Sequence, residues 1–214
     1  MKNSINRQID TLFEELENRD SEYTNHLVKD GIVNENIFNS ENTKVLFICK
    51  EPNNPKQKEG DFRDWWKTEL KHIFSHRIGS WAYGILENFP SYSVMNKRIK
   101  FDSLSRIAFI NIKKLGGTSQ STEMEILEHA KRNQDILQKQ IKLINPDIIV
   151  LGISWWSSVR NTLFQGFEHQ ILADYVHKYD NHLVINFYHP STRGKSNLDL
   201  YNELNRLINF NNRL

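Results

Sequence analysis

Hydrophobic positions along the chain follow two different spacings, and together they predict a sheet flanked by helices. Four short runs are continuously apolar, which is typical of strands buried on both faces of a parallel sheet. These runs cover 44–49, 107–110, 148–151 and 183–188. Between them, apolar residues recur at the three- and four-residue spacing of amphipathic helices. The predicted helices lie near 4–18, 65–74, 81–89 and 122–143, in a Trp-rich segment from residue 154, and over 198–207.

This order of elements predicts a three-layer α/β/α sandwich with a central, mainly parallel sheet of about four strands. The 214 residues contain no Pro-, Gly- or Ser-rich linker and no internal repeat. We therefore expect a single domain over 1–214, with a helical segment of about 1–40 before the first core strand.

Composition narrows the class of protein. Hydrophobic residues make up 38% of the chain and charged residues 25%, which suits a soluble globular protein and excludes a disordered one. The single cysteine, Cys49, lies inside an apolar run, which argues against a disulfide framework or a Cys-based zinc site. The first residues lack the apolar core of a signal peptide, and no apolar run approaches membrane-spanning length. We expect a cytoplasmic protein with no membrane partner.

The net charge of +2 does not by itself indicate a nucleic-acid partner. The distribution of charge is more informative, because basic residues gather near the ends of two predicted strands. They are Lys97, Arg98, Lys100, Arg106, Lys113 and Lys114 around the second strand, and Arg193 and Lys195 after the last. This placement is compatible with a phosphate backbone. It is equally the ordinary surface charge of helix ends and loops.

Two short motifs end the first and the last apolar runs. The first is Lys50-Glu51-Pro52-Asn53, and the second is the stretch His-Pro-Ser-Thr-Arg that begins at His189. In an open parallel sheet, ligands bind outside the carboxyl ends of the strands. A carboxylate from Glu51 and an imidazole from His189 are therefore predicted to share one site.

Together with Asn111 after the second strand and the stretch 145–152 around the third, these motifs resemble the uracil-DNA glycosylase superfamily. That family has a water-activating motif after its first core strand, an asparagine after a middle strand and a His-Pro-Ser motif after the last. The likeness spans roughly 44–195, although only short motifs carry it. The His-Pro-Ser-x-Arg pattern is most similar to the single-strand-selective branch. The first motif departs from the best-known branch, with Glu51 in place of Asp and Asn53 in place of Tyr.

The resemblance implies a DNA glycosylase that uses no metal or organic cofactor, with DNA as its partner, and we expect a monomer. A monofunctional enzyme is expected because, apart from Lys50, no lysine is placed as a Schiff-base nucleophile. Glu51 would orient a water molecule and stabilise the cationic sugar, and His189 would donate a hydrogen bond to the departing base. Each residue also has a purely structural interpretation, as a carboxylate that caps a turn and as a histidine hydrogen-bonded beside one. Lys50 is the one lysine placed as a candidate Schiff-base nucleophile.

Base recognition is assigned to four further residues. Asn111 would read the Watson–Crick edge of a flipped pyrimidine, or it closes a strand-end turn. Phe62 and Trp65 would stack on the base. Asn53 is smaller than the tyrosine that crowds the pyrimidine 5-position in the best-known branch, which predicts tolerance of 5-substituted or sugar-decorated cytosines. Such bases occur in some viral genomes, so a role in defence against foreign DNA is one hypothesis; the alternative is that Phe62 or Trp65 refills the space.

The remaining residues of the last motif are assigned to DNA. Ser191 would hold a phosphate, Arg193 would enter the stack where the base departs, and Lys195 adds positive charge to the same loop. Each is equally compatible with an ordinary surface loop. Three other tryptophans, Trp66, Trp155 and Trp156, are expected in the core.

Two alternative functions remain open at this point. The first is a non-catalytic member of the same fold that binds a base or nucleic acid, which would be favoured if Glu51 were turned into the protein. The second is an unrelated α/β hydrolase that acts on free nucleosides, whose binding would not weaken as salt rises.

Overall fold

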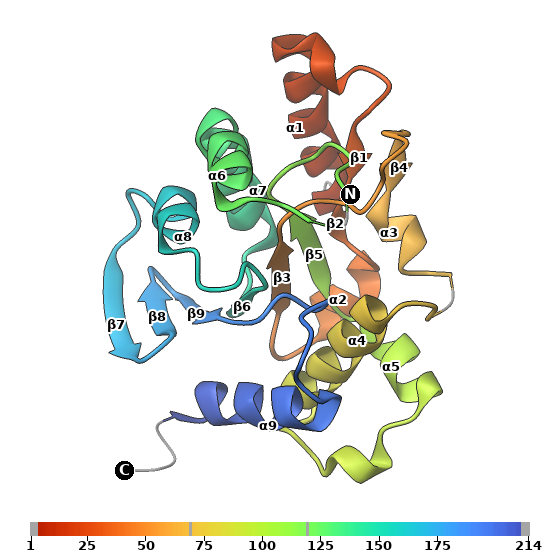
Figure 1. Ribbon diagram of the computed structural model, residues 1–214, viewed down its shortest axis with the longest axis vertical. Helices are drawn as coiled ribbons and strands as arrows, with labels where there is room; N and C mark the ends of the chain where they lie inside the picture. The colour runs from red at the N-terminus through yellow and green to blue at the C-terminus, as the bar shows by residue number, and fades with distance from the viewer. Residues whose placement is uncertain (1–3, 69, 119, 211–214) are drawn as a thin grey trace.

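The computed structural model describes residues 4–68, 70–118 and 120–210. Within them, a seven-stranded sheet has the order β2-β5-β3-β6-β9-β8-β7 (Figure 1). The strands are β2 Gly31–Ile32, β5 Ala108–Asn111, β3 Val45–Cys49, β6 Ile148–Leu151, β9 His182–Asn186, β8 Val176–Tyr179 and β7 His169–Ala173. The four middle strands β5, β3, β6 and β9 pair in parallel, which confirms the predicted mainly parallel core.

The sheet is wider than the sequence predicts, because antiparallel strands extend both edges. β2 pairs with β5 on one side, and β8 and then β7 extend the sheet beyond β9 on the other. Exposed side chains alternate poorly with buried ones along β7, so its hydrophobic pattern gives no strand signal. A separate parallel pair, β1 Val28–Lys29 with β4 Gly60–Asp61, lies beside the main sheet. The segment of about 1–40 therefore contains short strands as well as helices.

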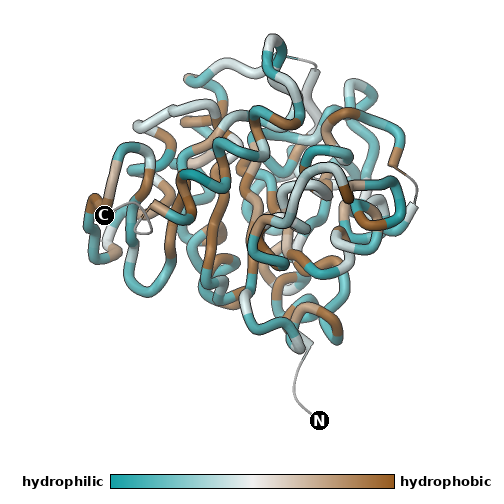
Figure 2. The backbone as a smooth tube through the Cα atoms, turned by 90° about the horizontal axis from the view of Figure 1, so that it is seen from below, coloured by the Kyte–Doolittle hydropathy of each residue, from teal (hydrophilic) through white to brown (hydrophobic). Residues whose placement is uncertain are grey.

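Helices cover both faces of the sheet, and two separate apolar clusters mark the two interfaces. One face packs against α1 Ile5–Arg19, α2 Glu35–Ser40, α6 Glu123–Arg132, α7 Gln134–Ile144 and α8 Ser157–Leu163. The other packs against α4 Ile73–Leu86, α5 Lys97–Leu104 and α9 Asn197–Ile208. Figure 2 shows apolar segments inside the molecule and hydrophilic ones around them. The architecture is thus mixed α/β with helices on both sides of a mostly parallel sheet.

Two predicted helix boundaries are wrong. The segment 122–143 forms two helices rather than one, because the buried Asn133 leaves the helical conformation and its side chain donates to the Tyr23 hydroxyl at 2.6 Å. The segments 65–74 and 81–89 divide differently from the prediction. A short helix, α3 Phe62–Trp65, comes first, and residues 73–86 then form one continuous helix.

A buried polar network fixes the carboxyl end of β5. The Lys114 ammonium lies 2.8 Å from both Asp30 carboxylate oxygens, and Gln140 donates to Asp30 at 2.7 Å. Asp30 also accepts the backbone N–H of Asn111 at 2.8 Å. Burial lowers the pKa of Lys114, and its proximity to Asp30 opposes that shift. Lys114 is fully buried, so it contributes nothing to a DNA-facing surface.

Candidate active site at the carboxyl ends of β3 and β9

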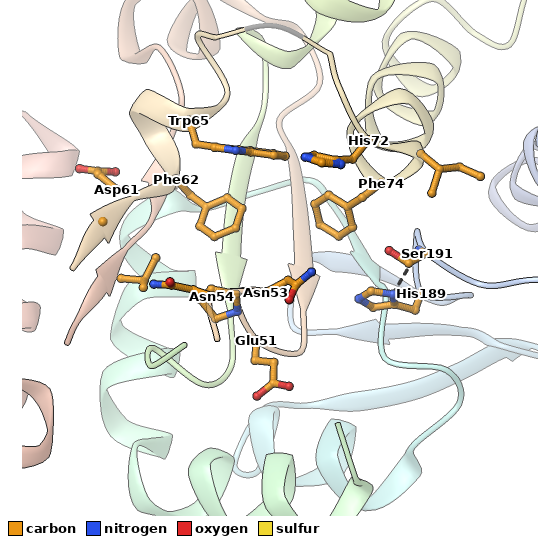
Figure 3. A pocket seen from close by; sticks show the side chains of 14 residues that line it. Glu51, Asn53, Asn54, Asp61, Phe62, Trp65, His72, Phe74, His189 and Ser191 are labelled. Carbon is orange, nitrogen blue, oxygen red and sulfur yellow. Dashed lines mark hydrogen bonds between the residues drawn. The ribbon is translucent and has the colours of Figure 1, made fainter. Parts of the chain in front are cut away.

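A pocket of about 550 Å³ opens where β3 and β9 end (Figure 3). It extends from His189 and Ser191 at one end to Gly60 and Asp61 at the other. Of the residues proposed from sequence, six line it: Glu51, Asn53, Phe62, Trp65, His189 and Ser191. Eight more complete the lining: Val28, Pro52, Asn54, Gly60, Asp61, His72, Ile73 and Phe74.

His189 carries a defined tautomer in this pocket. Its Nδ1 accepts the backbone N–H of Ser191 at 3.2 Å, so the proton of the neutral ring resides on Nε2. Burial, and secondly the positive charge of Lys50, lower the pKa of His189 to about 4. The imidazole is therefore neutral near pH 7, and its Nε2 edge is directed into the pocket (Figure 3). This arrangement offers a hydrogen-bond donor without a positive charge.

The sequence predicts a free carboxylate at Glu51, but in the structure both carboxylate oxygens have partners. One oxygen lies 2.8 Å from the Lys113 ammonium, and the other accepts from the Ser121 hydroxyl at 2.5 Å. Only 4% of the side chain is exposed. The carboxyl group points away from the aromatic rings of the pocket (Figure 3). Glu51 thus reaches the pocket from beneath, with both oxygens already engaged.

The loop after β5 covers this carboxylate because it contains two adjacent glycines. A Cβ on Gly117 would approach the Glu51 carboxyl carbon to 2.0 Å, and one on Gly116 would approach the Asn54 carbonyl oxygen to 2.3 Å. Backbone hydrogen bonds join the same segments, since Gly117 donates to Pro52 at 2.8 Å and accepts from Asn54 at 3.1 Å. Adjacent glycines are a sequence signal for such close backbone approach.

Aromatic side chains form the other wall. Phe62 and Phe74 lie on either side of the pocket centre, and Trp65 and His72 lie above them (Figure 3). The Trp65 and His72 rings stack with centroids 6.4 Å apart and an interplanar angle of 8°. Phe74 also lies 5.8 Å from the His189 ring. The sequence indicates Phe62 and Trp65, whereas it places residue 74 only at the end of a predicted helix and does not single out His72.

The two asparagines assigned to base recognition occupy different environments. Asn53 is exposed and lines the pocket, where a bridge to Gly117 holds its backbone. Asn111 is 1% exposed and does not line the pocket. Its side-chain nitrogen has no hydrogen-bond partner among the described residues. An unpaired buried amide costs about 1–3 kcal/mol. Asn111 lies on β5, the strand that also carries Phe109, and Phe109 stacks on Phe62 of the pocket.

No sequence motif indicates Arg77, but its side chain holds the loop that follows His189 through hydrogen bonds. Its guanidinium donates to the carbonyl oxygens of Pro190 at 2.9 Å, Thr192 at 2.6 Å and Lys195 at 2.9 Å. It also donates to the Asn197 side chain at 2.8 Å. Arg77 is 3% exposed, and burial lowers its pKa. A buried arginine from α4 therefore sets the path of the chain on which His189 and Ser191 lie.

The three residues assigned to DNA all lie on this loop. Ser191 is exposed and lines the pocket. Arg193 is exposed, and no hydrogen bond or ion pair engages it within the described part of the chain. Lys195 lies 3.6 Å from Glu203, with 42% of its side chain exposed. By contrast, Arg106 is bound to Glu41 and Glu87 and is not free to meet a phosphate.

Lys50 contacts a tryptophan ring and is not part of the pocket lining. Its ammonium is 3.8 Å from the centroid of the Trp156 ring, and burial lowers its pKa. Across the described residues, no group of three or more His, Cys, Asp or Glu side chains is placed to hold a metal ion.

Comparison with known proteins adds no family assignment: no protein-family model matches the chain, and no curated protein is similar to it. Among the helices of the described residues, none has the length and apolar character to cross a membrane.

Proposed function

We propose that the protein is a monofunctional DNA glycosylase that removes an altered pyrimidine and leaves an abasic site. The observation that carries this proposal is the neutral His189, whose Nε2–H faces a pocket lined by Phe62 and Phe74. A planar base suits a slot between aromatic rings, as in enzymes that act on a flipped nucleotide. Hydrolysis of an N-glycosidic bond requires a hydrogen-bond donor to the base and a carboxylate for the water, and His189 and Glu51 are residues of these two types.

In the proposed reaction, the bond between the sugar C1′ and the base nitrogen breaks, and its electron pair leaves with the base. The His189 Nε2–H stabilises the negative charge that develops on the base oxygen. A water oxygen bonds to C1′, and the proton that this water loses is taken up by the departing base. Glu51 orients the water and its negative charge offsets that of the sugar cation.

The shape of the pocket favours a pyrimidine with a substituent at the 5-position over uracil. Asn53 leaves the space open that a tyrosine would fill, and its exposed amide suits a hydroxylated substituent. Asn54 and Asp61 also line the pocket, but the Asn54 amide donates to the Lys58 carbonyl oxygen and the Asp61 carboxylate is bound to Arg63. A hydroxymethylated or sugar-decorated cytosine fits this lining. A glycosylase for such bases would act on foreign DNA, such as that of a virus.

Excision assays test the proposal directly. The protein is incubated with oligonucleotides that carry uracil, thymine, hydroxymethylcytosine or glucosylated hydroxymethylcytosine, and abasic sites are then cleaved with alkali. We expect Glu51→Gln and His189→Ala to lower excision by at least roughly 10²-fold, the scale of a lost positioned catalytic group. Glu128→Gln, an exposed residue on α6, is the matched control. Failure to release any base from all four oligonucleotides would overturn the proposal.

The Glu51–Lys113 contact favours a second candidate, a protein of this fold that binds a modified base without cleaving it. A carboxylate already paired and hydrogen-bonded to Ser121 is less available to water. This candidate predicts tight, base-dependent DNA binding with no abasic product.

A further inference from the structure

Three aromatic side chains from three separate segments meet beside His189, outside the pocket. Trp155 follows β6, Tyr175 lies in the turn between β7 and β8, and Tyr188 directly precedes His189. The Trp155 ring centroid is 4.4 Å from that of Tyr175 and 4.9 Å from that of Tyr188. We call Trp155, Tyr175 and Tyr188 the aromatic shelf.

Tyr188 packs against one of the apolar clusters, but burial in the core does not explain Trp155 and Tyr175. Trp155 was expected in the core, but it is only partly buried and belongs to neither apolar cluster. Tyr175 is also outside both clusters, and 48% of it is exposed. Two large aromatic side chains thus pack mainly against each other at the surface. Ordinary folding would place them inside, where more apolar area leaves water.

The backbone is strained where it presents these rings. Trp155 has φ 71° and Tyr175 has φ 65°, both in the left-handed region that bulky side chains disfavour. Ser154, at φ 58°, extends the strained stretch. Hydrogen bonds hold the conformation, because Ser154 donates to Phe187 at 3.3 Å and Asn186 donates to Tyr175 at 2.8 Å. Such strain persists only where the surroundings impose it, and it gathers at functional sites.

Positive charge borders the aromatic shelf. The Lys195 ammonium lies 5.1 Å from the centroid of the Tyr188 ring, and Arg193 is exposed on the same loop. Exposed aromatic rings bordered by cations are the recurring design of sites for single-stranded nucleic acid, in which bases stack and phosphates are neutralised.

We propose that the aromatic shelf is a stacking site for a nucleobase that flanks the target nucleotide in a single-stranded stretch of DNA. The inference rests on the proposed function, since it needs a DNA strand whose target base occupies the pocket. Tyr188 directly precedes His189, so the same segment of the chain contributes to the pocket and to the shelf, and in the proposed complex the strand continues from one to the other. The flanking base then stacks on Trp155 or Tyr175 and its phosphate faces Lys195.

Binding to undamaged DNA tests this site separately from catalysis. Fluorescence anisotropy is measured with a labelled, unmodified single-stranded oligonucleotide at several salt concentrations. Trp155→Ala and Tyr175→Ala are each expected to weaken binding at least roughly fivefold, the lower range for loss of one stacked base. Trp155→Phe and Tyr175→Phe keep a ring and should retain most of the affinity. Circular dichroism confirms that each variant is folded.

The salt dependence of DNA affinity distinguishes base stacking from neutralisation of phosphates. Stacking variants should leave the slope of log affinity against log salt unchanged, whereas Lys195→Met should reduce it by about 0.7, the value for one phosphate contact on a single strand. A single base-free spacer is then moved along the oligonucleotide. At the position where the missing base would stack on Trp155, wild type and Trp155→Ala should bind with equal affinity. Wild-type affinity in folded Trp155→Ala and Tyr175→Ala would overturn the inference.

The two proposals fail in different ways. If Trp155→Ala weakens single-strand binding but the wild-type protein excises no base, the aromatic shelf stands and the glycosylase proposal fails. If the protein excises a base and shelf variants bind as tightly as wild type, the shelf proposal fails alone.

Discussion

The Lys113 ammonium lies 2.8 Å from a Glu51 oxygen and 2.5 Å from a Glu125 oxygen, so one cation serves two carboxylates. Burial opposes the charge on Lys113, but hydrogen bonds to Glu125 and then Glu51 outweigh it and raise the pKa of Lys113. The side chains of Lys113 and Glu51 are only 10% and 4% exposed. Glu51 is therefore paired with Lys113 before any substrate binds.

Removal of Lys113 should therefore destabilise the protein. Lys113→Met leaves the Glu51 carboxylate buried and unpaired, and breaking a buried pair on one side costs about 3–5 kcal/mol. Urea unfolding at pH 7 measures the loss. The double variant Lys113→Met/Glu51→Gln should recover part of it, because it contains no unpaired buried charge. A single variant as stable as wild type would show that the pair is not effectively buried. Glu125→Gln, which leaves the Lys113–Glu51 contact intact, is the control.

The position of Glu51 could be predicted from the sequence, but its pairing with Lys113 could not. Continuous apolar runs predicted the four parallel strands, because burial on both faces leaves a pattern within each run. That placed Glu51 and His189 at one edge of the sheet. The partners of these residues leave no such pattern, since Lys113, Ser121 and Arg77 are distant in sequence and are brought close only by tertiary packing. The edge hairpin leaves no apolar run either, because β7 is largely exposed and β8 buries polar as well as apolar residues, among them His177.

His189 should titrate well below the usual range of histidine. Nuclear magnetic resonance of the imidazole protons should give a pKa of about 4, because the ring is buried beside the Lys50 ammonium. Lys50→Met removes the second cause and should raise that pKa towards 6.5, the ordinary value. An unchanged pKa in Lys50→Met would assign the whole shift to burial.

The lowered pKa of His189 also predicts how stability depends on pH. The unfolded chain binds a proton near pH 6.5, whereas folded His189 binds one only near pH 4, so the unfolded state holds more protons between these values. The free energy of unfolding should therefore be highest above pH 6.5 and fall as the pH decreases towards 4. Urea unfolding across this range should show a shallower decrease in His189→Gln than in wild type.

Arg77 is expected to act on catalysis through the position of His189. Arg77→Ala releases the loop that carries Pro190, Thr192 and Lys195, and displacement of a catalytic group by about 1 Å can cost roughly 10²-fold. We expect kcat to fall by roughly 10- to 10²-fold, with a much smaller change in the affinity for DNA. Arg77→Lys, which keeps the charge and fewer donors, should recover part of the rate. A folded Arg77→Ala with normal kcat would remove Arg77 from this role.

Arg193 is expected to act on duplex opening. It is exposed on the loop that follows His189, which in the proposed complex lies beside the strand that loses its base from the stack. Arg193→Ala should impair excision from a duplex more than from a single strand, because only the duplex carries the cost of unstacking and unpairing. Equal losses on both substrates would indicate an ordinary phosphate contact.

Asn53 is expected to set the range of bases that the pocket accepts. Asn53→Tyr places a ring in the space that now leads towards Asn54 and Asp61. Excision of hydroxymethylcytosine and its glucosylated form should fall at least roughly tenfold, while excision of uracil should be retained. Activity on uracil alone, unchanged by Asn53→Tyr, would contradict an open pocket. Glu59→Gln, on an exposed residue that does not line the pocket, is the control.

The strand order has a consequence for synthesis of the protein. β3 pairs on one side with β5 and on the other with β6, whose residues follow about a hundred positions later in the sequence, and β9 joins after that. At about 5–20 residues per second on the ribosome, residue 189 is made roughly 7–28 s after residue 51. A nascent chain thus carries Glu51 long before His189. A chain interrupted in that interval lacks the residue proposed to donate to the departing base, so the proposed activity requires that all strands of the sheet have been made.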